Sequence, residues 1–249
     1  MEFWDCHAGI GRWTVPPPAG PLEAPDLVAE MAHARIARAL VHHGLARDYD
    51  AAAGNEALLR EVTGLPDLIP CATLLPHHTG EFAHPRDLLP SLIGAGVRAV
   101  RLYPKSHRFS LEAWCAGSLL AGLEAHHLPL SIDFEETSWS EIHALCTDYP
   151  ALPVVVTRVN YRQERYLYAL WERHATLHVE SSLLQQHRGI EQIVDRFGPE
   201  RLLFGTGLPY YAAGAPILMV VRADIGDAAR QAIASGNLRR LLEAVTATA

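Results

Sequence analysis

Short runs of apolar residues alternate with longer amphipathic segments along almost the whole chain. The apolar runs are bounded by glycine, proline and polar residues, which is typical of buried strands. Eight such runs predict strands, at Phe3–Cys6, Ala39–Val41, Ile69–Leu74, Ala99–Leu102, Leu130–Asp133, Pro153–Thr157, Thr176–Val179 and Leu202–Phe204. The segments between them predict helices near residues 26–37, 54–63, 85–95, 110–126, 138–147, 163–173, 188–197 and 227–244.

Local end signals support these predicted helices. Ser138 followed by Glu141 forms an S-x-x-E capping box, which starts a helix. Gly96 and Gly198 lie where helices hand over to the next strand, a position that favours glycine.

Eight alternating strand–helix units in 249 residues predict a (β/α)8 TIM barrel, in a single domain over residues 1–249. The rival fold is a doubly wound open sheet, which usually needs a glycine-rich first turn. The motif Gly9-Ile10-Gly11 does not match GxGxxG, and no acidic residue follows a convincing second strand. The barrel is therefore the predicted fold.

Composition and charge narrow the classes of partner. Hydrophobic residues make up 49% and charged residues 20% of the chain, as in ordinary globular proteins with one large core. The formal charge is -7 and there is no basic run, so we expect no nucleic-acid partner. The four cysteines are widely spaced without a CxxC pair, which favours reduced thiols over a disulfide framework.

The sequence also predicts the compartment. No stretch reaches the roughly 18 apolar residues that a membrane span needs, so we expect no membrane association. Met1 is followed at once by Glu2 and Asp5, which is unlike a signal peptide. A cytoplasmic location is therefore expected.

Ionisable residues gather where the predicted strands end, which in a barrel is the functional face. Seven of the 14 histidines fall in these segments, at positions 7, 42, 43, 77, 78, 107 and 187. For any single histidine a structural or solvated role is the simpler interpretation. The set as a whole, together with the acidic and basic residues beside it, favours a pocket with ionisable walls.

Six segments carry a family resemblance: DCHAGIG (5–11), GVRAVRLYP (96–104), LPLSID (128–133), LPVVVTR (152–158), FGTGLP (204–209) and GNLRRLL (236–242). In this order and spacing they resemble the amidohydrolase-related family of the metal-dependent hydrolase superfamily. The segments span nearly the whole chain. The resemblance implies a TIM barrel and a hydrolase.

The resemblance also implies a metal site, from which this sequence departs. The family carries H-x-H on strand one, histidines at the ends of strands five and six, and an aspartate after strand eight. These residues hold one or two divalent metals that activate water. The matching positions here are His7, Gly9, Asp133, Arg158 and Gly207, so only His7 is kept and only Asp133 is a substitute ligand. The chain is thus expected to be a divergent member with a degenerate metal site.

The leading hypothesis is a metal-independent hydrolase that cleaves a C–N or C–O bond of a small anionic substrate, without a cofactor. A guanidinium takes over the electrostatic role of the metal, because it can pair with Asp133 or clamp a carboxylate or phosphate. The expected catalytic residues are His7, Asp133, Arg158, Glu180 and His187, with Glu180 and His187 as a second acid–base pair. The expected substrate-binding residues are Arg101, Lys105, His77, Asn160 and Thr206.

Two alternatives stay open at this point. One is a metal-dependent hydrolase or decarboxylase that binds zinc or manganese through non-standard ligands, drawn from His7, His42, His77, Asp133 and Glu180. The other is a non-catalytic, ligand-binding pseudoenzyme, since a fold alone does not imply a function. The number of ionisable groups at the strand ends favours an enzyme. The apolar outer helices are compatible with a homodimer.

Overall fold

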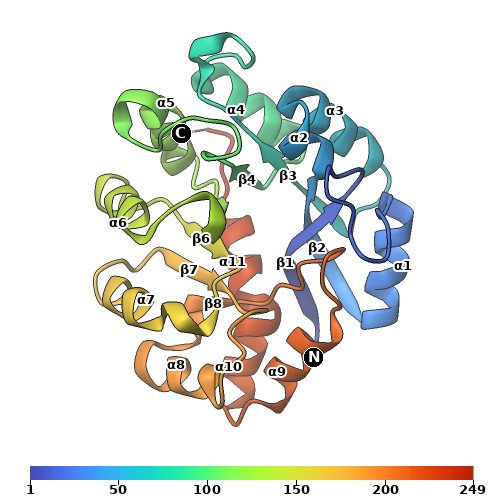
Figure 1. Cartoon of the computed structure of the whole chain (residues 1–249), viewed down its shortest axis with the longest axis vertical. Coiled ribbons are helices and arrows are strands. Elements are labelled where there is room, and N and C mark those ends of the chain that lie inside the picture. The colour runs from blue at the N-terminus through green and yellow to red at the C-terminus, as the bar shows by residue number, and fades with distance from the viewer. Residues whose placement is uncertain (249) are drawn as a thin grey trace.

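The apolar runs of the sequence form eight parallel strands in a computed structural model that describes residues 1–248 (Figure 1). Each strand pairs with its sequence neighbour, in the order β1 to β8. The strands are β1 (Phe3–Ile10), β2 (Ile36–His43), β3 (Leu68–Thr73), β4 (Ala99–Leu102), β5 (Leu130–Asp133), β6 (Val154–Thr157), β7 (Leu177–Glu180) and β8 (Leu202–Leu203). The predicted (β/α)8 TIM barrel is confirmed.

The barrel closes between β1 and the segment that follows β8. The amide of Cys6 donates to the carbonyl of Phe204, and the amide of Gly9 donates to that of Leu208, both at 2.9 Å. In return, the amide of Gly207 donates to the carbonyl of His7 at 2.9 Å. This closure brings the ends of β7, β8 and β1 side by side.

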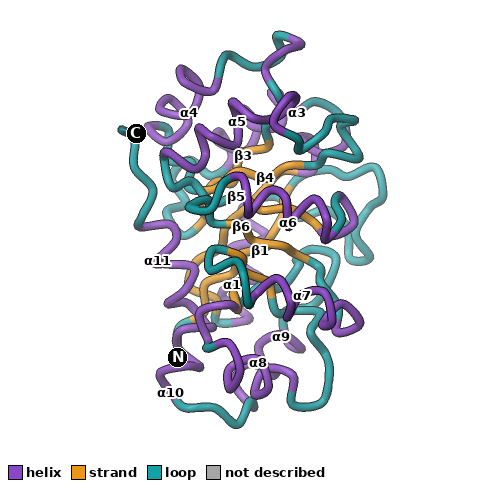
Figure 2. Tube along the Cα trace, turned by 90° about the vertical axis from the view of Figure 1, so that its left-hand side faces the viewer, coloured by secondary structure: helices purple, strands orange, loops and turns teal. Residues whose placement is uncertain are grey.

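Helices surround the strands as an outer layer (Figure 2). They are α1 (Ala24–Ala34), α2 (Gly44–Asp48), α3 (Ala51–Glu61), α4 (Pro85–Gly94), α5 (Ala113–Ala125), α6 (Trp139–Asp148), α7 (Glu164–Trp171), α8 (Gly189–Phe197), α9 (Gly214–Arg222), α10 (Asp227–Gln231) and α11 (Asn237–Glu243). A π-helical turn at Ala232–Gly236 joins the last two. No helix among residues 1–248 is long and apolar enough to cross a membrane.

Several predicted boundaries were wrong. Strand β1 runs to Ile10 instead of ending at Cys6, so His7 lies within the strand. The helix predicted at 26–37 ends at Ala34, because Arg35 takes a left-handed conformation with φ 58° and Ile36 opens β2. Helix α9 was not predicted. The helix start predicted at Ser138 is confirmed, since Ser138 Oγ accepts from the amide of Glu141 at the start of α6. The capping box is only half formed, because the carboxylate of Glu141 accepts from the Ser138 hydroxyl instead of the Ser138 amide.

Every second side chain of a strand points into the barrel, and these side chains form layers along the barrel axis. Leu40, Ala99, Val155 and residues of other strands share one buried apolar cluster with Leu238 of α11. The residue two positions further along each of these strands lies on the same side, nearer the carboxyl end. These next residues are His42, Arg101 and Thr157, and all three are buried. A polar layer therefore lies on top of an apolar one.

Candidate active site

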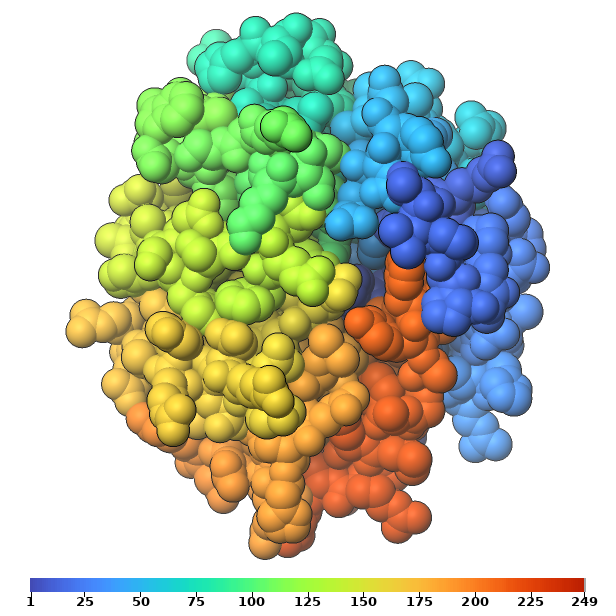
Figure 3. All heavy atoms as spheres, in the orientation of Figure 1, coloured from blue at the N-terminus to red at the C-terminus, as the bar shows by residue number. Residues whose placement is uncertain are grey.

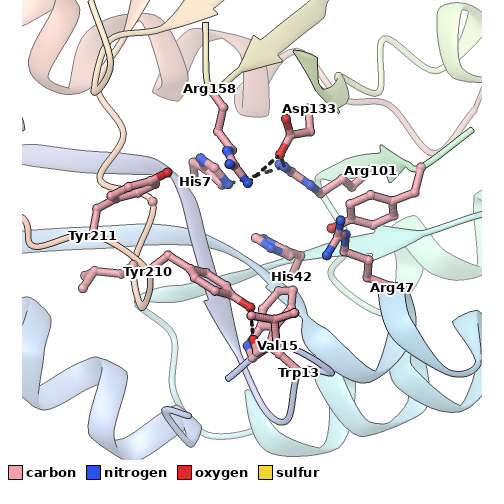
Figure 4. A pocket seen from close by; sticks show the side chains of 13 residues that line it. His7, Trp13, Val15, His42, Arg47, Arg101, Asp133, Arg158, Tyr210 and Tyr211 are labelled. Atoms are coloured by element: carbon pink, nitrogen blue, oxygen red, sulfur yellow. Dashed lines mark hydrogen bonds and ion pairs between the residues drawn. The ribbon is translucent and has the colours of Figure 1, made fainter. Parts of the chain in front are cut away.

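A cavity of about 270 Å³ opens at the carboxyl end of the barrel. In the space-filling view, a hollow lies between the blue N-terminal part of the chain and the orange segment after β8 (Figure 3). Thirteen residues line the cavity (Figure 4): His7, Trp13, Val15, His42, Arg47, Arg101, Tyr103, Asp133, Arg158, Gly207, Leu208, Tyr210 and Tyr211. Of the ten predicted site residues, His7, Arg101, Asp133 and Arg158 are brought together here.

Arg101 of β4 lies at the centre of this group and is only 2% exposed. Its Nη1 donates to Ser131 Oγ at 2.9 Å, and its Nη2 donates to Thr157 Oγ1 at 3.0 Å. The same Nη2 is 3.4 Å from His7 Nε2 and 3.7 Å from Asp133 Oδ2. The guanidinium is thus a fixed positive charge between these two residues.

Arg158 approaches Asp133 from the end of β6. Its Nη1 is 3.5 Å from Asp133 Oδ2, and its Nη2 is 3.3 Å from Oε1 of Glu135. Its backbone is left-handed, with φ 60°, a conformation that is uncommon for residues other than glycine. The Arg158 side chain is 31% exposed, in contrast to the buried Arg101. Asp133 therefore contacts two guanidinium groups, one internal and one facing the opening.

His7 is paired with Glu180 across the closed barrel. Nδ1 of His7 is 3.5 Å from Oε2 of Glu180, whose side chain is fully buried. Glu180 also accepts hydrogen bonds from the amides of Ser182 and Arg158. Burial raises the pKa of Glu180, but the contacts with His7 and Ser182 outweigh burial and hold this pKa below its ordinary value. The carboxylate orients the imidazole, so that Nε2 points towards Arg101.

His42 is a second buried imidazole of the cavity. Its ring stacks on that of His7, with the centroids 5.7 Å apart, and meets the ring of Trp13 edge-on. Burial and the nearby charge of Arg101 hold the pKa of His42 well below its ordinary value. His42 is therefore a neutral imidazole at physiological pH.

Arg47 and Tyr103 complete the polar wall, and neither was among the predicted site residues. The guanidinium of Arg47 lies over the Tyr103 ring, 5.5 Å from its centroid, and 3.5 Å from Glu136. The Tyr103 hydroxyl is buried without a hydrogen-bond partner in the described chain, and burial raises its pKa to about 12. Arg47 lies in α2, directly after β2. Its position after a strand end was the sequence feature that could have identified it as a site residue.

Thr206 makes structural hydrogen bonds and does not face the cavity. Its hydroxyl donates to Asp5 Oδ2 at 2.5 Å and accepts from the amide of Leu208 at 3.1 Å, while its own amide donates to Asp5 Oδ1. Both side chains are fully buried, and Thr206 does not line the cavity. Burial raises the pKa of Asp5, although the hydrogen bonds from Thr206 and the His7 amide act in the opposite direction. This contact fastens the loop after β8 to β1.

Two of the predicted substrate-binding residues support loops away from the cavity lining. Lys105 is exposed, and its Nζ donates to the carbonyls of Glu135 and Thr137 at 2.9 and 3.0 Å. Asn160 caps a short 3-10 turn by accepting from the amide of Arg162. Both residues stabilise the rim instead of lining the cavity.

The remaining predicted histidines also lie outside the lining. His77 packs against the rings of His78 and His84, with centroids 4.3 and 4.6 Å away. His187 is exposed in the turn before α8. The imidazole that contacts Glu180 is that of His7, so the expected pairing of Glu180 with His187 is not formed.

The positions that the resemblance assigns to metal ligands do not fit a divalent metal. A Cβ added at Gly9 would lie 2.7 Å from Trp13 Cζ2, and one added at Gly207 would lie 2.7 Å from Tyr211 Cδ2. Aromatic rings thus fill the space of two ligands, and Arg101 lies between the two that remain. Among residues 1–248, no group of three or more histidine, cysteine or carboxylate side chains is placed to hold a metal.

Comparison with known proteins agrees with this architecture. A family model described as amidohydrolase matches residues 7–244. No curated protein matches the chain.

Three solved structures illustrate the similarity. A 5-carboxyvanillate decarboxylase from Sphingomonas paucimobilis has a TM-score of 0.76 and 13% identity, covering 99% of this chain and 100% of its own. An uncharacterised TIM-barrel protein from Bordetella bronchiseptica has a TM-score of 0.75 and 17% identity, covering 98% and 99%. A probable 2-pyrone-4,6-dicarboxylic acid hydrolase from Acinetobacter baumannii, with citric acid bound, has a TM-score of 0.71 and 14% identity, covering 98% and 100%. At these identities the similarity shows the fold.

Proposed function

The chain belongs to the amidohydrolase family, and from this membership we propose that it is an enzyme acting on a small anionic molecule at the mouth of the barrel. The proposed reaction is hydrolysis of a C–N or C–O bond by the chain's own side chains, without a metal. The neighbours named above include a decarboxylase and a probable hydrolase of carboxylic acids.

The observation that carries the proposal is the charge of the cavity lining. Three guanidinium groups, those of Arg47, Arg101 and Arg158, line the cavity, whereas Asp133 is its only carboxylate among the described residues. Arg101 and Arg158 share that carboxylate. Guanidinium groups bind carboxylates and phosphates through paired, charge-assisted hydrogen bonds. An anionic substrate is the ligand that this lining favours.

His7 is the proposed acid–base residue. Glu180 holds its Nδ1 side, which leaves Nε2 on the side of Arg101 to accept a proton from an attacking water. The water oxygen forms a bond to the carbonyl carbon of the substrate. The electron pair of the C=O double bond moves onto the carbonyl oxygen, which becomes negatively charged. The guanidinium groups of Arg101 and Arg158 stabilise that developing negative charge.

The second half of the reaction returns the proton. When the C–N or C–O bond breaks, the protonated His7 imidazole donates its proton to the leaving nitrogen or oxygen. Asp133 is held by two guanidinium groups and serves to position Arg158 over the substrate. These roles use every predicted residue that lines the cavity and need no Lewis acid.

Decarboxylation is a second candidate, and it uses the same groups. The arginines would hold the substrate, and His7 would deliver a proton to the carbon that loses CO2. Nε2 of His7 lies on the side of Arg101, within the lining that holds the arginines, which favours this candidate because a proton donor then stands beside the bound carboxylate. The two reactions differ in their products, since hydrolysis of an ester or amide releases a new acid and decarboxylation removes one.

The test is a substrate screen with purified protein stripped of metal by a chelator. Carboxylate-bearing lactones, esters, amides and aromatic acids are assayed for acid release and for CO2 release, with and without added zinc or manganese. We expect turnover that is independent of added metal and is lost in His7→Ala. Turnover only with zinc or manganese would establish the metal-dependent alternative. Saturable binding without turnover across the screen would favour the pseudoenzyme.

A further inference from the structure

Helix α6 lies between α5 and α7 on one side of the barrel (Figures 1 and 2). Two surface grooves run along it, one between α5 and α6 and the other between α6 and α7. Exposed Ser140 lines both of them.

The α5–α6 groove is acidic and has an exposed aromatic residue. Its charged lining residues are Glu112, Glu141 and Asp148, and no lysine or arginine of the described chain lines it. Trp114 at its edge is 73% exposed, which is unusual for a tryptophan.

The α6–α7 groove has the opposite charge. Arg165 and Arg173 line it, and no carboxylate of the described chain lines it. Tyr166 in this groove is 61% exposed. The carboxylate of Glu172, the C-cap residue of α7, pairs with Arg196 of α8. The charge of this groove is therefore positive.

We propose that the chain forms a symmetric homodimer through the surface of α5, α6 and α7. The twofold axis lies in the interface, parallel to α6. Because α5 and α7 flank α6 on opposite sides, such an axis places α5 of each copy opposite α7 of the other. The acidic groove of each copy then meets the basic groove of the other copy, and the contact is made twice, as in any isologous interface. Trp114 and Tyr166 supply the aromatic anchors, and large aromatic residues are enriched at the centres of interfaces.

Charge reversal on either groove tests the pairing. One variant carries Arg165→Glu and Arg173→Glu, which makes both grooves acidic. The other carries Glu112→Lys and Asp148→Lys, which makes both grooves basic. Asp148 ends α6, where a lysine suits the helix dipole, so this change does not weaken the helix. The matched control carries Arg222→Glu and Arg239→Glu, an equal change of charge on exposed residues elsewhere.

Mass is measured by light scattering and by sedimentation over a range of concentrations. We expect a dimer for the wild-type chain and for the control. Each groove variant is expected to dissociate roughly 100-fold more readily, because like charges then face each other. A mixture of the two groove variants in equal amounts is expected to form a heterodimer, and all four changes in one chain are expected to restore a homodimer.

The mixing experiment distinguishes charge repulsion from misfolding, because a misfolded variant would not form a heterodimer with the other variant. A wild-type chain that stays monomeric at about 100 μM would overturn the proposal, since specific dimers are tighter than this. A dimer that survives both groove variants would place the interface elsewhere. Two monomeric groove variants that do not pair when mixed would also contradict it.

Discussion

The Arg101 guanidinium bridges His7 and Asp133, with Nη2 3.4 Å from Nε2 of the imidazole and 3.7 Å from Oδ2 of the carboxylate. These two residues are what remains of the ligand set that the family resemblance implies. Arg158, at the end of β6, was the predicted substitute for the metal cation. Arg101 has the better geometry for that role, because it is buried and contacts both residues, whereas Arg158 contacts Asp133 but not His7 and also pairs with Glu135.

Metal content is the first prediction that follows from this bridge. We expect wild-type protein incubated with zinc and manganese and then desalted to retain less than about 0.1 equivalent of either metal. Arg101→Ala removes the cation from between His7 and Asp133, so this variant should retain more zinc than the wild type. Elemental analysis by mass spectrometry measures the metal content of the wild type and of the variant. Stoichiometric metal in the wild-type chain would show that Arg101 moves aside and would revive the metal-dependent alternative.

Anion binding should depend on the arginines that face the opening. Arg158→Gln removes the guanidinium that is 31% exposed at the cavity, and we expect it to weaken binding of citrate or a related carboxylate about 10- to 100-fold. Arg162→Gln is the matched control, because Arg162 is exposed in the same loop and does not line the cavity. Titration calorimetry at low ionic strength measures the difference. Equal affinity in the two variants would remove Arg158 from the anion site.

The repeated strand–helix unit of this fold could be predicted because it depends on the pattern of residues that are close in sequence. Strands β4 and β5 have the predicted bounds, since their apolar runs are short and sharply delimited. Strand β1 was cut short because His7 and Gly9 interrupt its apolar pattern. Hydrogen bonds to the segment after β8 keep those residues in the strand, and such long-range partners leave no mark in the local pattern.

The composition of the site could be predicted only in part, for the same reason. Glu180 was assigned to His187 because both follow strand seven in the sequence. Closure of the barrel instead brings Glu180 against His7, a residue at the other end of the chain. Trp13 and Tyr211 fill the spaces next to Gly9 and Gly207, and their rings reach the cavity from loops whose course the sequence pattern does not predict.

Glu180 should make stability depend on pH on the acid side. Its pKa is lower in the folded chain than the ordinary value of 4.5, so the ionised carboxylate stabilises the fold. This contribution is fully present above pH 4.5 and is lost as the pH falls through the lower, folded pKa. We expect Glu180→Gln to reduce the free energy of unfolding by about 3 kcal/mol near neutral pH, because it removes one partner of a buried pair.

Urea unfolding of this variant at several pH values measures the effect. The difference from the wild type should shrink as the pH falls below 4.5. Glu243→Gln, which changes an exposed carboxylate of α11, is the control and should match the wild type throughout. A constant deficit at every pH would mean that Glu180 acts through its shape and hydrogen bonds and not through its charge.

Thr206 should matter for stability and not as a nucleophile. Thr206→Val keeps the shape of the side chain but removes the hydroxyl that donates to Asp5, which leaves a fully buried carboxyl with one donor fewer. A loss of about 1–3 kcal/mol in the free energy of unfolding is expected, because an unsatisfied buried acceptor carries that cost. Thr206→Ser keeps the hydroxyl and should retain most of the stability. Once a substrate is found, Thr206→Val should still turn it over under conditions in which the variant is folded. Complete loss of turnover in a folded Thr206→Val, with Thr206→Ser active, would instead assign the hydroxyl to the chemistry.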